Sequence, residues 1–175
     1  NLGPLMSKGG SDMAKETWTT DGGSGPDDFA VFITSKGQCI VFAGTDPASS
    51  ATWALQGVYE IGEPIGRRCF TKVGGDLAVI TLDGVVSLSQ AIVTDRGVAQ
   101  KAAITAKIRP AFNAAAKTAR SNYGWQAITY PLGTEFIVNV PLTEGVLMHQ
   151  YVMNPLTGAW CRYIGQNAVS WELFN

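Results

Sequence analysis

The sequence predicts a mainly β fold, an antiparallel meander like the blades of a propeller or part of one, with one kinked helical insertion. Short runs of β-branched and aromatic residues recur along the chain, turn residues separate them, and one Ala-rich stretch without glycine interrupts them. With 175 residues, 46% of them hydrophobic, the chain is long enough to form a core. We divide it into an extended arm at 1–28 and a β-rich domain at 29–175.

The arm is predicted from composition. Residues 1–28 are dense in Gly, Ser, Asp and Pro and show little periodicity, with Trp18 as the one apolar anchor. From Phe29 the pattern changes to FAVFITSKGQCIVFAG, two apolar runs on either side of a short turn. This predicts a β-hairpin in which Gly37 supplies the positive φ that the turn needs.

Further strands are predicted before the insertion. A strand at about 52–61 is followed by the breaker GEPIG, and then by the runs RCFTKV, LAVITL and VVSLS. The last two runs are separated by Asp83 and Gly84, and Asp-Gly between apolar runs is a strong hairpin signal. Short turns between short strands indicate a meander.

The insertion is predicted at 98–120. Its sequence, VAQKAAITAKIRPAFNAAAKTAR, is Ala-rich and repeats apolar residues at helical spacing. Pro110 should kink the helix or divide it into two near 108–110, because its ring clashes with the preceding turn. Thr94 or Asp95 is the candidate start cap, and Asn122 with Gly124 the candidate end.

Three to five more strands are predicted after the insertion. The candidate runs are WQAITY, EFIVNV, HQYVMN, GAWCRY and AVSWELF. The turn at 154–158, NPLTG, has a proline that fixes φ at its second position and a glycine at its end. Strands, then helix, then strands indicate a β architecture with a helical insertion.

Composition limits the possible partners. The net charge is −1, only 15% of residues are charged, and the basic residues are scattered, so no nucleic-acid site is predicted. Low charge is also typical of subunits buried against neighbours. No run is long and apolar enough to span a membrane. Cys39, Cys69 and Cys161 lie in apolar runs without metal-binding spacing, so we expect buried thiols, with one disulfide left open.

No catalytic, cofactor-binding or metal-binding residue is predicted, and we expect no enzyme. The single histidine, His149, has no nucleophile or carboxylate beside it in a known signature, which favours a structural role. The Gly-rich run at 21–28 lacks the ligand pattern of a calcium loop and does not lead into a phosphate-binding helix. Most other carboxylates lie in predicted turns, where they accept backbone hydrogen bonds. They are Asp27, Asp28, Asp46, Glu60, Asp76 and Asp83.

Six aromatic residues lie near the ends of predicted strands, where a blade places the residues that pack between blades. They are Trp53, Tyr59, Trp125, Tyr151, Trp160 and Trp171. Core packing is the first interpretation. A platform that stacks sugars or bases is the alternative, and it requires exposed rings.

The run from Trp18 to Ser89 resembles a segment of tailed-phage structural proteins of the head-to-tail, tail-nozzle or packaged-DNA stabilisation kind. The later runs NYGWQAITYP, EFIVNVP and QYVMNPLTGAWCRYIGQNAVSWELF fit the same pattern, including an Asn-x-x-Thr-Gly-x-Trp turn. The resemblance implies a ring-forming component of the virion, assembled in the host cytoplasm. Since 175 residues are too few for a large propeller at about 40–45 residues per blade, we do not expect one chain to close a ring.

The resemblance therefore predicts a structural virion protein of the neck or tail, with other copies and other virion proteins as partners. The insertion at 98–120 and the arm at 1–28 are the candidate assembly regions, with Arg109 and Lys117 as candidate contacts for an acidic surface or as a solvated helix face. The alternative is a carbohydrate- or receptor-binding propeller module. A sialidase-like glycosidase is third, because SSATW at 49–53 resembles a turn of those propellers, although no carboxylate pair is evident.

Overall fold

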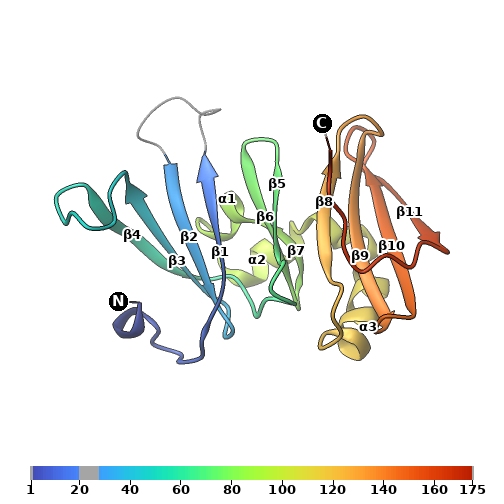
Figure 1. Cartoon of the computed structure of the whole chain (residues 1–175), viewed down its shortest axis with the longest axis horizontal. Helices are drawn as coiled ribbons and strands as arrows, with labels where there is room; N and C mark the ends of the chain where they lie inside the picture. Colours follow the sequence, from blue (N-terminus) through green and yellow to red (C-terminus); the bar gives the residue numbers. More distant parts are fainter. Residues whose placement is uncertain (1, 20–27, 175) are drawn as a thin grey trace.

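The computed structural model describes residues 2–19 and 28–174, which form three antiparallel sheets, each with its strands in chain order (Figure 1). A short 3-10 helix, η1 (Gly3–Leu5), precedes the first sheet. Sheet 1 contains β1 (Asp12–Thr19), β2 (Asp28–Thr34), β3 (Gln38–Gly44) and β4 (Trp53–Glu60). Sheet 2 contains β5 (Phe70–Val73), β6 (Asp76–Thr81) and β7 (Gly84–Ser87). Sheet 3 contains β8 (Gln126–Tyr130), β9 (Glu135–Thr143), β10 (Leu147–Asn154) and β11 (Ala159–Ile164).

The sheets are arranged as a fan. The first strands of the sheets, β1, β5 and β8, lie near the middle of the molecule, where β5 contacts both β1 and β8 (Figure 1). The last strands of sheets 1 and 3, β4 and β11, lie at opposite ends of the long axis. The predicted mainly β fold is confirmed, and the arrangement fits part of a propeller.

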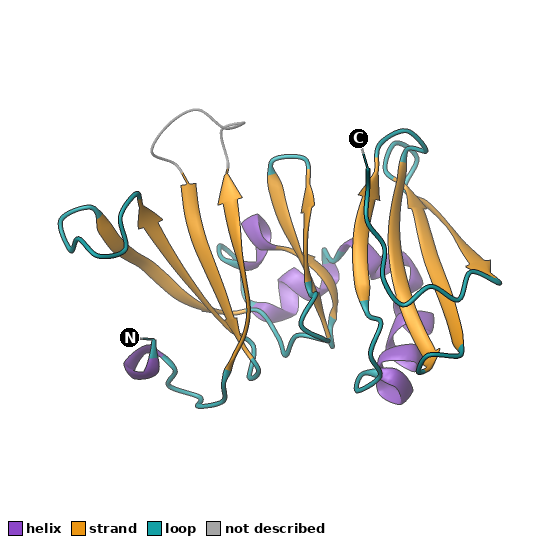
Figure 2. Cartoon of the chain, in the orientation of Figure 1, coloured by secondary structure: helices purple, strands orange, loops and turns teal. Residues whose placement is uncertain are grey.

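The helical segment lies between β7 and β8 and consists of several short helices (Figure 2). They are α1 (Leu88–Ala91), α2 (Arg96–Lys101), the 3-10 helix η2 (Ile104–Ile108) and α3 (Arg109–Ala119). They cover the sheets, because α1 contacts β6, η2 contacts β7 and α3 contacts β9. The break predicted near 108–110 is confirmed, with Pro110 in the first turn of α3. Proline is tolerated there because backbone N–H groups in the first turn make no hydrogen bond within the helix.

One continuous core joins the three sheets and the helices. From sheet 1 it takes the side chains on one face, including Val31, Ile33 and Val41, and from sheet 3 it takes Phe136 and Val138. These residues share one face of each sheet because every second side chain of a strand points to the same face. The helices contribute small residues of α3, which allow the helix to approach the sheet closely.

The arm predicted at 1–28 requires a correction. β1 occupies Asp12–Thr19 and pairs with β2 along its length, so this part of the segment belongs to the first sheet. Trp18 is the predicted anchor: it is buried, and its indole Nε1 donates to the backbone oxygen of Gly75 at 3.3 Å. Composition did not predict this strand, because DMAKETWT has few β-branched residues. The strand is stabilised by pairing with the strongly apolar β2.

Four further expectations are corrected. The helical segment begins at Leu88 and not at 98, and Asp95, the residue before α2, makes no side-chain cap. The predicted strand AVSWELF is extended but unpaired as a strand. Cys161 is exposed on β11, an edge strand, whereas Cys39 and Cys69 are buried as expected, and all three are free thiols.

Candidate functional site

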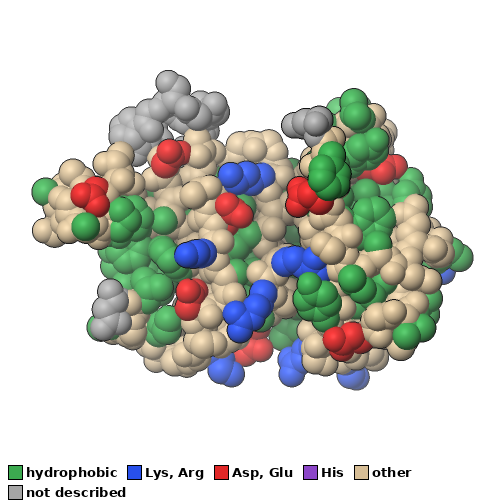
Figure 3. All heavy atoms as spheres, in the orientation of Figure 1, with side chains coloured by type: hydrophobic (Ala, Val, Ile, Leu, Met, Phe, Trp, Pro, Cys, Tyr) green, Lys and Arg blue, Asp and Glu red, His purple; other side chains and the backbone are tan. Residues whose placement is uncertain are grey.

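Sheet 1 carries apolar side chains on the face that points away from the core. Phe42 stacks on Trp53 with ring centroids 5.4 Å apart and meets Phe32 edge-on at 6.1 Å. Leu55 and Val58 of β4 lie on the same face and are 43% and 38% exposed. We call these five residues the aromatic face. Figure 3 shows hydrophobic side chains gathered at the end of the molecule that carries β3 and β4.

Local sequence explains how both faces of sheet 1 become apolar. In FAVFIT and QCIVFAG nearly every position is hydrophobic, a pattern typical of strands covered on both faces. Ile40, which pairs with Phe32 and Val58, is fully buried although it lies outside the main core. Ser7 and Lys8 lie at one end of this face, where they bond to Gln38 and Glu60. Phe32, Phe42 and Trp53 are half-buried, and Leu55 and Val58 are exposed. A contiguous apolar surface of this kind is typical of an interaction site.

Sheet 3 is different, because the chain covers its outer face with its own C-terminal segment. Residues 166–174, which we call the strap, run across this face in extended conformation (Figure 1). The amide of Gln126 on β8 bonds both backbone groups of Trp171: its Nε2 donates to the oxygen at 2.8 Å and its Oε1 accepts from the nitrogen at 3.0 Å. Arg68 also donates to the backbone oxygen of Val169, at 2.6 Å.

Two buried amides hold the strap from the middle of the sheet. Asn139 on β9 donates through Nδ2 to the backbone oxygens of Gly124 and Ala168, at 2.8 and 3.1 Å. Gln150 on β10 donates through Nε2 to Asn139 Oδ1 at 2.7 Å and to the backbone oxygen of Gln166 at 2.9 Å. The Oε1 of Gln150 is buried and accepts no hydrogen bond.

A cavity of about 320 Å³ lies between the strap and sheet 3, and we call it the strap cavity. Its lining comprises Ile128, Tyr130, Glu135, Ile137, Gln150, Tyr163, Gln166, Trp171, Glu172 and Leu173. The hydroxyl of Tyr163 donates to Glu135 Oε1 at 2.8 Å, and this hydrogen bond to the carboxylate raises the pKa of Tyr163. The Nε1 of Trp171 is a second buried polar atom without a partner.

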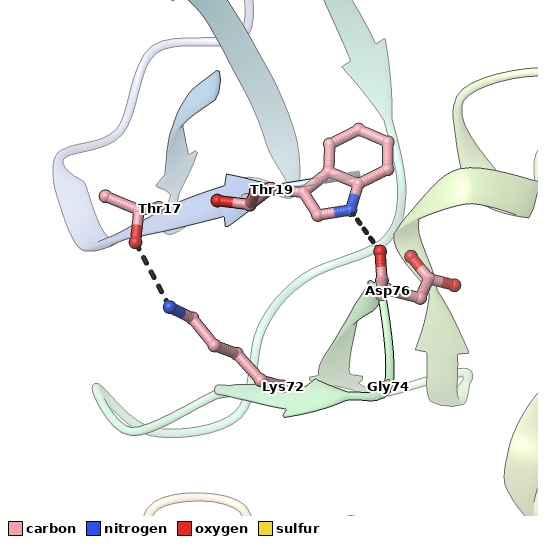
Figure 4. Close-up of a pocket in the computed structure, with 7 residues that line it drawn as sticks. Thr17, Thr19, Lys72, Gly74 and Asp76 are labelled. Carbon is pink, nitrogen blue, oxygen red and sulfur yellow. Dashed lines mark hydrogen bonds between the residues drawn. The ribbon is translucent and has the colours of Figure 1, made fainter. Parts of the chain in front are cut away.

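A second cavity lies where sheets 1 and 2 meet (Figure 4). The ammonium group of Lys72 on β5 donates to Thr17 Oγ1 of β1 at 3.3 Å, and the bond from Trp18 to Gly75 crosses the same junction. Asp76 accepts from the backbone N–H of Leu77 at 2.7 Å and from the hydroxyl of Ser87. Lys72, Trp18 and Asp76 all bond to other groups of the chain. We therefore interpret this cavity as part of the structural contact between sheets 1 and 2.

A third cavity is basic. Arg67, Arg68 and Arg120 line it, no acidic residue lines it, and the guanidinium of Arg68 lies 4.9 Å from the ring centroid of Tyr123. Arg68 is therefore engaged by both the strap and an aromatic ring. On the face shown in Figure 3, Lys and Arg side chains alternate with acidic ones, as the scattered basic residues of the sequence predict.

The residues considered during sequence analysis do not come together. His149 lies in β10 opposite Val140 and Ile164, and no group of three metal-ligating side chains occurs within residues 2–19 and 28–174. Arg109 is half-buried and donates to the backbone oxygen of Gln100 at 2.6 Å, while Lys117 is exposed on α3. Most of the candidate calcium loop at 21–28 lies outside the described residues.

The amide residues of sheet 3 were missed by sequence analysis. Gln126, Asn139 and Gln150 sit in the apolar runs WQAITY, EFIVNV and HQYVMN, and each pairs with the next across the sheet. The available signal was an amide side chain inside each of the three runs. Of the aromatic residues predicted at strand ends, Trp125 packs in the core against Phe112, with ring centroids 5.8 Å apart.

The sequence matches no model of a known protein family and no curated protein. Among the described residues, no helix has the length and apolar character needed to cross a bilayer.

Proposed function

We propose that this protein is a structural component of a tailed-phage virion, in the neck or tail, and that it acts by self-association into a ring. The observation that supports self-association is the aromatic face of sheet 1. When another molecule covers an apolar sheet face, the free energy falls, because apolar surface is removed from water. The resemblance of the sequence to phage structural proteins supplies the proposed location.

The proposed occupant of the aromatic face is a second copy of the chain. The two ends of the long axis differ, because one carries β4 of sheet 1 and the other carries β11 (Figure 1). The aromatic face includes residues of β4, and Ile164, the last residue of β11, is exposed. A contact between unlike ends is heterologous, and such contacts form a ring when the rotation from copy to copy closes. The low charge of the chain favours close packing between copies.

Light scattering after size-exclusion chromatography tests self-association. We expect the wild-type mass to correspond to three or more copies, and the double variant Leu55→Lys with Val58→Lys to run as a monomer, because two charges would be buried in the contact. Val93→Lys with Leu132→Lys is the matched control, since both residues are exposed on other surfaces. Circular dichroism checks that both variants fold. A monomeric wild type, or a charged variant that keeps the wild-type mass, contradicts the proposal.

Mass spectrometry of purified particles tests the location. If the protein is a virion component, its peptides remain with particles through a density gradient at a constant ratio to the other structural proteins. Loss of those peptides during purification contradicts a place in the virion and leaves the self-association result unaffected.

A further inference from the structure

Three arginines meet at one cavity, which we call the arginine cavity. Arg67 and Arg68 lie in the loop between β4 and β5, and Arg120 directly follows α3, so the fold brings together residues that are far apart in the chain. The whole chain has 14 acidic residues and 13 basic ones. An excess of basic residues therefore does not explain this concentration of positive charge.

The chain supplies no counter-charge for the three arginines. Within residues 2–19 and 28–174 none of them forms an ion pair, and the ion pairs found there use Lys8, Lys36 and Arg96 instead. None of the described residues that line the cavity is acidic. The side chains of Arg67 and Arg120 are exposed, so a ligand can reach their guanidinium groups. A concave site lined by charge of one sign attracts ions of the opposite sign, which here are anions.

The third guanidinium is already held in place. Arg68 is half-buried, its Nη2 donates to the backbone oxygen of Val169 at 2.6 Å, and its guanidinium lies 4.9 Å from the ring centroid of Tyr123. The indole Nε1 of Trp125, another lining residue, donates to the backbone oxygen of Ala119 at 2.8 Å and fixes the end of α3 beside the cavity. A guanidinium has several N–H groups, so Arg68 keeps donors for a ligand, and a ligand need not order this side chain.

We propose that the arginine cavity binds the phosphate group of a small organic phosphate. A phosphate monoester carries about two negative charges near neutral pH and three acceptor oxygens, and guanidinium groups bind such oxygens in pairs. A carboxylate has one charge and two oxygens, which a single arginine satisfies. Three arginines without an acidic neighbour therefore match a phosphate better than a carboxylate.

The cavity also has room for the organic part of such a ligand. Its volume is about 530 Å³, within the usual range for small-molecule sites, about 300–1,000 Å³. Half-buried Met13 and the ring of Tyr123, which is 60% exposed, provide apolar surface beside the arginines. A nucleic-acid backbone would instead need a longer row of basic side chains, whereas on the face shown in Figure 3 basic and acidic side chains alternate.

Calorimetric titration of the full chain at low salt tests the proposal with matched pairs of ligands. The pairs are adenosine monophosphate with adenosine and glucose 6-phosphate with glucose. At least one phosphate is expected to bind about tenfold or more tightly than its uncharged partner, and to weaken as sodium chloride is added. Inorganic pyrophosphate identifies the source of the phosphate. Equal affinity for pyrophosphate would assign recognition to the phosphate alone, and tighter binding of the organic phosphate would assign a part to the apolar surface.

Arginine variants locate the site. Arg67→Gln and Arg120→Gln are each expected to weaken binding of the phosphate about tenfold, as loss of a charge-assisted hydrogen bond predicts. Arg162→Gln is the matched control, because it removes the same charge from an exposed residue of β11, and it should bind like the wild type. All three side chains are exposed, and circular dichroism checks that each variant is folded.

The proposal is overturned if no phosphate binds more tightly than its uncharged partner, or if Arg162→Gln weakens binding as much as Arg67→Gln and Arg120→Gln. A short DNA duplex that binds where no small phosphate does would also overturn it and would assign the arginines to nucleic acid. If no phosphate binds and Arg67→Gln or Arg120→Gln lowers the mass seen by light scattering, the arginines belong to a contact between copies.

The arginine cavity is formed within one chain and does not depend on the proposed ring. A monomeric protein that binds the phosphate contradicts only self-association, and a ring that binds none contradicts only the phosphate site.

Discussion

At the scale of single residues, the three thiols have different environments. Cys39 and Cys69 are buried in the core, and burial raises the pKa of each to about 12, with the charge of Cys69 as a second cause for Cys39. Cys161 is exposed on β11. Because the thiolate is the reactive form, burial and the raised pKa protect Cys39 and Cys69, whereas a reagent can reach Cys161.

We therefore expect one fast-reacting thiol among three. At pH 8 a disulfide reagent such as dithionitrobenzoate should label one thiol per chain quickly, and urea should release the other two. Cys161→Ser should abolish the fast phase, while Cys39→Ser should keep it. Fast labelling of two or more thiols in the folded wild type would show that Cys39 or Cys69 is accessible.

The same pKa values predict a loss of stability at alkaline pH. A folded-state pKa of about 12, above the ordinary 9.0, favours the protonated thiol in the folded state. This contribution is complete below pH 9 and is lost as the pH rises from 9 towards 12. At pH 10 the free energy of unfolding in urea should be lower than at pH 8 by roughly 1 kcal/mol per buried thiol.

The double variant Cys39→Ala with Cys69→Ala separates the thiols from other groups that titrate above pH 9. Its unfolding free energy should change less between pH 8 and pH 10 than that of the wild type. Equal pH dependence in the two proteins would assign the alkaline loss to groups other than these cysteines.

At the scale of elements, the turn between β2 and β3 depends on Gly37. Its φ is +78°, and a Cβ atom there would lie 2.4 Å from the carbonyl carbon of Gly62. The backbone oxygen of Gly37 accepts from the N–H of Ile61 at 3.0 Å, so this turn also holds the end of β4. A side chain at Gly37 would disturb both the hairpin and the loop that follows β4.

Gly37→Ala should destabilise the fold by about 2 kcal/mol or more, from the left-handed conformation and the backbone clash together. Gly74→Ala is a matched control, because its φ is +61° and nothing lies within 4 Å of an added Cβ. The control should cost about 1 kcal/mol. Thermal unfolding monitored by circular dichroism measures both. Equal losses would mean that Gly62 moves away at little cost.

Several elements could be predicted from sequence because their signals are local. The hairpin of β2 and β3, the Asp83-Gly84 turn and the break at Pro110 follow from turn chemistry and from runs of apolar residues. β1 could not be predicted, because its stability comes from pairing with β2. The alternation in AVSWELF predicts a strand, but in the structure this segment bonds to side-chain amides of sheet 3.

At the scale of the whole molecule, a single core predicts a single unfolding transition. Phe112 of α3 is fully buried and packs on Trp125 beside sheet 3, and both belong to the cluster that includes sheets 1 and 2. Phe112→Ala should therefore lower the free energy of unfolding by about 3–5 kcal/mol. Its effect should appear equally in far-ultraviolet and near-ultraviolet circular dichroism.

Leu132→Ala is the control for this prediction. Leu132 is exposed in the turn before β9, so its loss should change stability by less than about 0.5 kcal/mol. Separate transitions for different probes in the Phe112→Ala variant would show that the sheets unfold independently, contrary to one shared core.

The sequence by itself determined the mainly β class, the position of most strands and turns, and the presence of a broken helical insertion. These features depend on neighbouring residues, whose spacing and conformational preferences are visible in one stretch of chain. The tertiary structure decided that Phe42 and Trp53 face outward, that Cys161 is exposed, and that Gln126, Asn139 and Gln150 form a row beneath the strap. Each of these depends on pairing between strands and on contacts between residues far apart in the chain, which local patterns do not encode.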